Sequence, residues 1–308
     1  MIMKAISYSV FGAGKPRQDN CFDVNSYMRG LAICLRMNRL LYSEWVNIIH
    51  TDRATYEAYK LYFDALQSEK IEIVVCKDAP LCLAMLWRLK PVFEQRWDQA
   101  ARGYNGHKYT HVLCRDTDSP ATYREVQAVE QWIKSDKAVH SITDSVSHTI
   151  ALMGGTCGFR PAYITERLST SDWDSMISRS GGIDFNNKGS DQDFLNREIY
   201  PLVAKQGTDS ITQHYFSGHA RTFLSDFHTC TCAPTAGHVN GCPNDYAINL
   251  PDELRESNSI CGHIGSSGHY STSTERFLRK YRNQFDDLHN AEGNYPDVFY
   301  WYKDGSLG

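Results

Sequence analysis

The first half of the chain alternates between two hydrophobic patterns. Short apolar runs rich in Val and Ile are separated by longer segments in which apolar residues recur every three or four positions. The segment 25–41 shows the second pattern, with Tyr27, Leu31, Cys34 and Leu35 among its apolar positions. Together the two patterns predict strands at 4–10, 45–50, 71–76 and 109–114, and helices at 25–41, 54–67, 81–93 and 123–135.

Strands that alternate with helices are typical of a parallel sheet whose strands are joined by helical crossovers. We therefore expect an α/β fold with a Rossmann-like first half. Ligands of such sheets bind at the carboxyl ends of the strands, here the loops after Val10, His50, Cys76 and Cys114. The second half is less periodic, and its long loops are rich in Gly, Ser, His and Cys, which suits segments that contact a second substrate.

Composition narrows the function classes. The 308 residues are 42% hydrophobic and 22% charged, with a formal net charge of −4, which is ordinary for a globular protein. This charge does not indicate a nucleic acid or an anionic membrane as partner. No stretch approaches the roughly 18–20 apolar residues of a membrane span, and the N-terminus lacks the apolar core of a signal peptide. We therefore expect a cytoplasmic protein with mostly reduced cysteines.

Two carboxylates follow the fourth expected strand. Asp116 and Asp118 are two residues apart, so both can turn toward one point, and hard oxygen ligands suit Mn²⁺ or Mg²⁺. The alternative is an Asp-rich turn that caps the next helix. Phosphatases of the haloacid-dehalogenase type also carry Asp-x-Asp after a strand. They are disfavoured because Arg115 interrupts the apolar run and Pro120 stands where they have Thr or Val.

Two further motifs lie in the second half: Ser-Asp-Gln-Asp-Phe-Leu-Asn at 190–196 and Cys-Gly-His-Ile-Gly-Ser-Ser-Gly at 261–268. Together with the Asp116 motif and with Arg88 on the helix before it, their order resembles the retaining GT-A glycosyltransferases of the glycogenin and lipopolysaccharide-galactosyltransferase type. The string around Asp116 is also similar to that of uncharacterised viral and bacterial glycosyltransferase-like proteins. The resemblance implies one GT-A domain over 1–308 with a mixed central sheet, a nucleotide-binding half at 1–150 and a donor-sugar and acceptor half at 151–308.

The resemblance assigns roles around the metal and the donor sugar. Asp116 and Asp118 would hold Mn²⁺ or Mg²⁺, with His263 as a third protein ligand. Asp191 and Gln192 would face the hydroxyls of the donor sugar. Asp193 completes this catalytic set, either by orienting Asp191 or as the N-cap of a helix at 194–203.

A second set of residues would contact the nucleotide and its phosphates. Arg88 would pair with a phosphate or a sugar hydroxyl, and its alternative is a surface arginine on an amphipathic helix. The Lys-Pro-Trp that often follows the family's His is missing here, so the Gly-Ser-Ser-Gly run at 265–268 would supply backbone N–H donors instead. The implied nucleotide contacts are Ser7, Tyr8, Asp52, Arg88, Gly265 and Ser266.

A cluster of cysteine and histidine lies apart from these motifs. Cys230, Cys232, His238 and Cys242 have the side-chain types of a structural Zn²⁺ site. Their Cys-x-Cys spacing is tighter than the usual Cys-x₂-Cys, so zinc, free thiols and a disulfide all remain open.

The predicted activity is transfer of a hexosyl or pentosyl group from a nucleoside-diphosphate sugar, with UDP as the expected nucleotide, to an acceptor hydroxyl. Only the resemblance implies retention of configuration. One alternative is a metal-dependent nucleotidyltransferase or phosphohydrolase on a similar sheet, and another is a zinc-stabilised binding protein. The Asp-Gln-Asp motif favours sugar transfer, since a phosphatase does not need it. The acceptor stays open, and a modified base of viral DNA is one candidate that the charge does not indicate.

Overall fold

A computed structural model describes residues 3–14, 24–93, 108–117, 119, 121, 123–135, 137–143, 150–168, 172–204 and 211–215. Within these ranges seven strands form one mixed sheet in the order β3-β2-β1-β4-β6-β5-β7. Their bounds are β1 Met3–Ser9, β2 Trp45–Asp52, β3 Ile71–Cys76, β4 Tyr109–Arg115, β5 Val139–Thr143, β6 Thr156–Phe159 and β7 Ile211–Tyr215.

The first four strands are parallel, as the alternating pattern predicts. β1 pairs with β2 on one side and with β4 on the other, and β2 pairs with β3. The chain therefore builds outward from β1 in both directions, and the carboxyl ends of β1 and β4 form a topological switch point, where ligands of open α/β sheets bind. β6 lies antiparallel between β4 and β5, and β5 pairs in parallel with β7. The expected α/β fold with a mixed sheet is confirmed.

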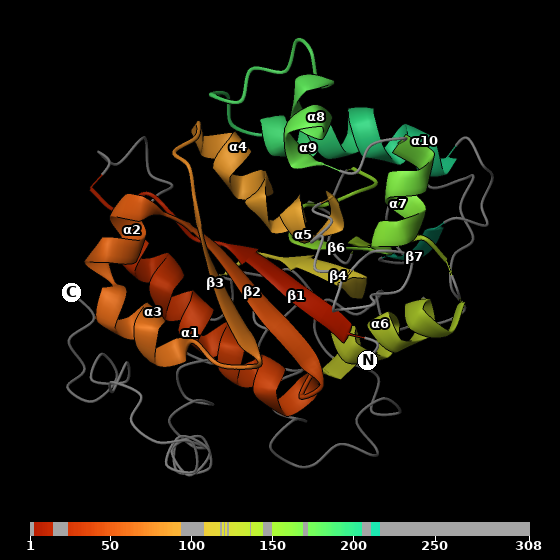
Figure 1. Ribbon diagram of the computed structural model, residues 1–308. Coiled ribbons are helices and arrows are strands. Elements are labelled where there is room, and N and C mark those ends of the chain that lie inside the picture. Colours follow the sequence, from red (N-terminus) through yellow and green to blue (C-terminus); the bar gives the residue numbers. More distant parts are fainter. Residues whose placement is uncertain are drawn as a thin grey trace.

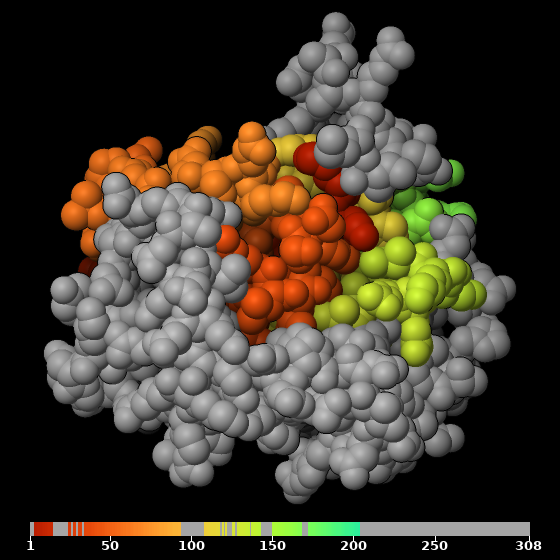
Figure 2. Space-filling model, turned by 90° about the horizontal axis from the view of Figure 1, so that it is seen from below, coloured from red at the N-terminus to blue at the C-terminus, as the bar shows by residue number. Residues whose placement is uncertain are grey.

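Helices cover both faces of the sheet, and each face has its own hydrophobic core (Figure 1). A different set of helices covers each face. One face carries α1 (Val24–Leu41), α2 (Arg53–Ala58), α3 (Lys60–Leu66) and α6 (Tyr123–Ser135). The other carries α4 (Leu81–Met85), the 3₁₀ turn η1 (Leu86–Leu89), α5 (Lys90–Phe93), α7 (Pro161–Leu168), α8 (Trp173–Ser178), α9 (Ser190–Phe194), the π-helical turn η2 (Leu195–Ile199) and α10 (Tyr200–Ala204). Figure 2 shows the α1 side, where α6 (yellow-green) reaches the surface beside the first elements (red to orange).

Alternation along β4 directs its last side chains to opposite faces. Val112 and Cys114 belong to the core under η1, whereas Leu113 belongs to the core under α6. The same alternation continues past the strand. Arg115 therefore turns toward α6, and Asp116 turns toward η1.

Three expected helices are interrupted in the structure. The helix predicted at 54–67 divides at Tyr59 into α2 and α3. The one predicted at 81–93 contains η1, because Pro91 has no N–H to donate to the carbonyl of Trp87, and the N–H of Lys90 bonds to that carbonyl instead. The third begins at Ser190 rather than at 194 and changes to a π-helical turn after Phe194. Among the described helices, none has the length and hydropathy to cross a membrane.

Candidate functional site

Arg88 joins two carboxylates that are far apart in the sequence. Its Nη1 donates a short hydrogen bond to Oδ1 of Asp116, and its Nη2 lies 3.5 Å from Oδ2 of Asp191. Arg88 belongs to η1, Asp116 follows β4, and Asp191 lies in the first turn of α9. The side chains of Arg88 and Asp191 are buried, whereas that of Asp116 is 39% exposed. The structure thus gathers three of the predicted site residues at the carboxyl end of β4, with Asp116 as the exposed member.

The charges of this cluster do not balance, because two carboxylates share one guanidinium. Burial opposes the charge on Arg88, but Asp116 and Asp191 outweigh it, so the pKa of Arg88 lies above its usual value. Burial also raises the pKa of Asp191, and Arg88 offsets only part of this effect while Asp116 adds to it. The cluster therefore holds Arg88 firmly charged and makes ionisation of Asp191 harder than in water.

The backbone of Arg88 is fixed by the two strands of the switch point. Its N–H donates to Oγ of Ser9 at 2.9 Å, and this hydroxyl donates to the carbonyl of Met85 at 3.2 Å. On the other side, the Cys114 thiol donates to the Arg88 carbonyl at 3.5 Å. Ser9 at the end of β1 and Cys114 near the end of β4 thereby set the position of the guanidinium.

Two glycines make room for the cluster. A Cβ atom on Gly154 would lie 2.3 Å from Nη2 of Arg88, and one on Gly155 would lie 1.9 Å from Oδ2 of Asp116. Both distances are far below a van der Waals contact, so a residue with a side chain would displace the ion pair. The Gly154-Gly155 loop, just before β6, is therefore part of the site, although its glycines were not among the predicted residues.

Gln192 and Asn196 attach α9 and η2 to this loop. Oε1 of Gln192 accepts the N–H of Gly154 at 3.1 Å, and its Nε2 lies 3.4 Å from Oδ2 of Asp191. Asn196 accepts the N–H of Leu152 at 3.0 Å and donates to the Leu152 carbonyl at 2.9 Å. The side-chain amides of Gln192 and Asn196 thus bind the backbone of the segment 152–154, and these bonds position Asp191.

The start of α9 explains the orientation of the acidic motif. Gly189 is the N-cap, with a φ of 93° that favours glycine, and Ser190 donates to the carbonyl of Asp184 at 2.6 Å. Asp191 and Asp193 follow in the first turn, where the helix dipole favours negative charge. The interpretation of Asp193 as the N-cap of a helix at 194–203 is therefore wrong, because the helix begins at Ser190 and its N-cap is Gly189.

Three of the residues assigned to the nucleotide make contacts outside the Arg88 cluster. Tyr8 is buried and its hydroxyl accepts from Asn38 at 2.6 Å, while the buried Ser7 hydroxyl lies 3.4 Å from Nδ1 of His50. Asp52 caps α2 through the N–H of Thr55 and also accepts the N–H of Gly12. Nucleotide contact by Ser7, Tyr8 and Asp52 stays a prediction. Arg88 is not the surface arginine of the alternative interpretation, since its side chain is 4% exposed.

Several predicted residues fall outside the described ranges. These are Asp118, His263, Gly265, Ser266, Cys230, Cys232, His238 and Cys242. Within the described ranges, no three His, Cys, Asp or Glu side chains converge as a metal site. Asp116 still fits the expected hard cation, because its carboxylate is partly exposed and Arg88 binds its Oδ1, which leaves Oδ2 beside Gly155.

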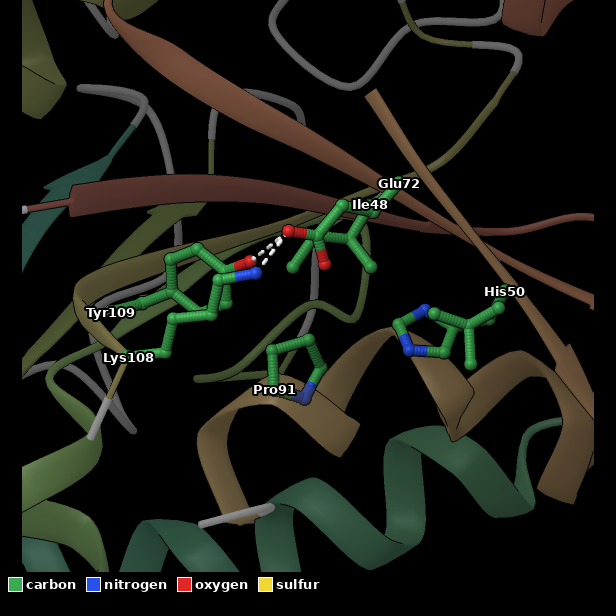
Figure 3. Close-up of a pocket in the computed structure, with 7 residues that line it drawn as sticks. Ile48, His50, Glu72, Pro91, Lys108 and Tyr109 are labelled. Atoms are coloured by element: carbon green, nitrogen blue, oxygen red, sulfur yellow. Dashed lines mark hydrogen bonds and ion pairs between the residues drawn. The ribbon is translucent and has the colours of Figure 1, made fainter. Parts of the chain in front are cut away.

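A small hollow lies away from this cluster, lined in part by residues at the amino ends of β3 and β4 (Figure 3). Lys108 and Tyr109 both point to Glu72 across it, and the Tyr109 hydroxyl donates to the carboxylate at 3.0 Å. Its volume is about 20 Å³, enough for a water molecule but not for a nucleotide or sugar.

Sequence reasoning missed Ser9, Gly154, Gly155 and Asn196. The Gly-Gly pair and the Asn at the end of the 190–196 motif were visible signals, but their contacts join segments that lie about 40 to 70 residues apart. Comparison of the chain with models of known protein families and with curated proteins gives no match.

Proposed function

We propose that this protein is a metal-dependent glycosyltransferase of the GT-A type, which transfers a sugar from a nucleoside-diphosphate sugar to an acceptor hydroxyl. The observation that supports it best is the joining of Asp116, Arg88 and Asp191 in one cluster at the β1–β4 switch point. These residues come from three motifs that the resemblance assigns to metal, phosphate and sugar. The mixed sheet with helices on both faces agrees with the fold that the resemblance implies.

Each member of the cluster has a role that its surroundings suit. Asp116, the exposed carboxylate, would hold the cation together with Asp118 and His263, and a bound Mn²⁺ would stabilise the charge of the departing nucleoside diphosphate. Arg88 carries a firmly held positive charge between the metal position and Asp191. Asp191 and Gln192 would bind sugar hydroxyls beside Arg88, where the Asp191 side chain is buried and Gln192 is held by Gly154 and Asn196.

The proposal is tested with a panel of nucleoside-diphosphate sugars in the presence of Mn²⁺, with release of nucleoside diphosphate as the readout. Slow transfer of the sugar to water makes the assay independent of the acceptor. We expect release from one or a few donors, loss of release in excess EDTA, and loss in Asp116→Asn. Release that continues unchanged in EDTA would contradict the metal role.

The same assay separates the alternative enzyme classes by their products. A nucleotidyltransferase would form pyrophosphate from a nucleoside triphosphate and a sugar phosphate. A phosphohydrolase would release inorganic phosphate. Either product, formed in an Asp116-dependent reaction without transfer from any sugar donor, would replace the glycosyltransferase proposal.

A further inference from the structure

Cys114 and Cys157 form a thiol pair beneath the Arg88 cluster. They face each other directly in the antiparallel pairing of β4 and β6, and both side chains are fully buried. Residues opposed in this way have Cα atoms about 4.5 or 5.5 Å apart, and disulfides span Cα separations of about 4.4–6.8 Å. The backbone therefore already has the spacing of a disulfide.

Each thiol also bonds to a segment that builds the candidate site. Sγ of Cys114 donates to the carbonyl of Arg88 at 3.5 Å, and Sγ of Cys157 donates to the carbonyl of Gly154 at 3.7 Å. Arg88 provides the guanidinium, and Gly154 lies against it with no space for a side chain. The pair thus contacts the two backbone segments that meet at the guanidinium of Arg88.

We propose that Cys114 and Cys157 are a site of reversible oxidation by small peroxides, and that the disulfide loosens the Arg88–Asp116 cluster and reduces its activity. One thiol reacts with the peroxide O–O bond to form a sulfenic acid and one water. The second thiol then displaces the sulfenic oxygen, which leaves as a second water, so two thiols and one H₂O₂ give one disulfide and two H₂O. A dithiol reductant reverses the reaction.

The disulfide acts on the site through two changes. It removes both S–H donors, so the carbonyls of Arg88 and Gly154 lose these hydrogen bonds. It also requires both side chains to rotate until the sulfur atoms are about 2.05 Å apart, which moves them away from the two carbonyls. Because Gly154 and Gly155 already leave no spare room beside Arg88 and Asp116, a small displacement changes the ion pair. The effect on activity rests on the proposed function, whereas disulfide formation does not.

Cys82 provides a matched control on the same side of the sheet. It is buried, it lies near Asp191, and its thiol donates to the carbonyl of Asn187 at 2.9 Å. It shares the burial and the neighbourhood of the site, and its thiol also bonds to a carbonyl, but it lies in the helix α4 rather than opposite a cysteine in paired strands.

The experiment treats the full chain with hydrogen peroxide and maps the cysteines by differential alkylation and peptide mass spectrometry. We expect a cross-link between Cys114 and Cys157 in the wild type and in Cys82→Ser, its removal by dithiothreitol, and no such cross-link in Cys157→Ser. Oxidation of either thiol to a sulfinic acid without the cross-link, or a cross-link of either to another cysteine, would overturn the proposal.

Two further readouts measure the consequence. Hydrogen exchange should become faster in peptides covering 86–93 and 152–158 after oxidation, whatever reaction the protein catalyses. Mn²⁺-dependent nucleoside diphosphate release should fall at least about tenfold and recover with dithiothreitol, in the wild type and Cys82→Ser but not in Cys157→Ser. A mapped disulfide with unchanged exchange in both segments would overturn the coupling to the site. A disulfide with faster exchange, in a protein that releases no nucleoside diphosphate even when reduced, would contradict only the proposed function.

Discussion

Two buried arginines lie at the end of β4, one on each face of the sheet, and they are used differently. Arg115 pairs through Nε with Glu125 of α6 at 2.7 Å, and its Nη1 donates to the carbonyls of Cys114 and Cys157. Both side chains of this pair are almost completely buried. Arg88 instead divides its charge between Asp116 and Asp191, and Asp116 is 39% exposed.

The difference separates a structural ion pair from a candidate site. In the described part of the chain, Glu125 is the carboxylate that balances Arg115, and the pair is closed to solvent, so its function is to fix α6 against β4. Among the described residues, two carboxylates contact Arg88, one more than the guanidinium can balance, and the exposed one can bind a cation. Raised pKa values alone do not distinguish the two, because opposite charges raise the pKa of both arginines. The number and exposure of the carboxylates distinguish them.

The largest expected effect is the loss of stability when the structural ion pair between Arg115 and Glu125 is broken. Glu125→Ala leaves Arg115 charged and buried with no carboxylate, which should lower the free energy of unfolding by about 3–5 kcal/mol. Urea denaturation measures it. Glu130→Ala, in the same helix, removes an exposed carboxylate 3.9 Å from Lys134 and should change stability by less than about 0.5 kcal/mol. Equal effects of the two substitutions would show that the buried Arg115–Glu125 pair contributes no more to stability than an exposed ion pair.

The second prediction concerns the other face. Asp116→Asn should reduce Mn²⁺-dependent nucleoside diphosphate release by about 100-fold or more, because the exposed carboxylate is the proposed metal ligand. Its stability should fall much less than that of Glu125→Ala, since Arg88 keeps Asp191. Asp64→Asn, which removes an exposed partner of Lys60 on α3, should leave activity unchanged. Full activity of the Asp116→Asn protein would show that the metal site does not include Asp116.

The third prediction tests the glycine loop. A Cβ on Gly155 would overlap Oδ2 of Asp116, so Gly155→Ala should reduce release by about 10-fold or more and lower stability by about 1–3 kcal/mol. Gly181→Ala is the control, since no atom of the described residues lies within 4 Å of its added Cβ. Comparing the two by activity and urea denaturation isolates the contact with Asp116. Normal activity in Gly155→Ala would show that Asp116 tolerates displacement.

The parallel half of the fold was accessible from the sequence because its signals are local. The strand at Ile71–Cys76 and the helix at Tyr123–Ser135 have the predicted bounds, since each has an uninterrupted pattern of the right period. The position of β6 was not predictable. It has only four residues, Thr156–Phe159, one of them glycine, and its antiparallel place between β4 and β5 depends on pairing across the sheet.

The candidate site also has a part that could be predicted from local sequence and a part that could not. Asp116 and Asp191 belong to motifs that can be recognised in the sequence, and the structure brings both to Arg88. The guanidinium of Arg88 links the two carboxylates, and Gly155 leaves space for the Asp116 carboxylate. Both features depend on contacts between segments far apart in the chain. No local pattern of charge or hydrophobicity carries that information.

The last and smallest expected effect concerns Asp191, whose burial raises its pKa. The native state then holds the proton more tightly than the unfolded chain, so the stabilisation is present below the unfolded value of about 4 and is lost as pH rises from there through the native pKa. At pH 7 the wild type carries the cost of a buried carboxylate, whereas Asp191→Asn does not, and Arg88 keeps Asp116. The variant should therefore be at least as stable as the wild type at pH 7, with a difference that narrows on acidification toward pH 4.

Denaturation of both proteins between pH 4 and 8 measures this trend, and Asp172→Asn supplies the opposite sign. Hydrogen bonds from Ser175 lower the pKa of Asp172, so its stabilisation is present at neutral pH and is lost as pH falls. For activity we expect the opposite ranking, with the wild type more active than Asp191→Asn. Asp191→Asn should reduce sugar transfer more than it reduces calorimetric UDP binding, because the proposed partner of Asp191 is the sugar. A variant that is less stable than the wild type at pH 7, or that loses UDP affinity along with transfer, would assign Asp191 to the structural support of Arg88, as Glu125 supports Arg115.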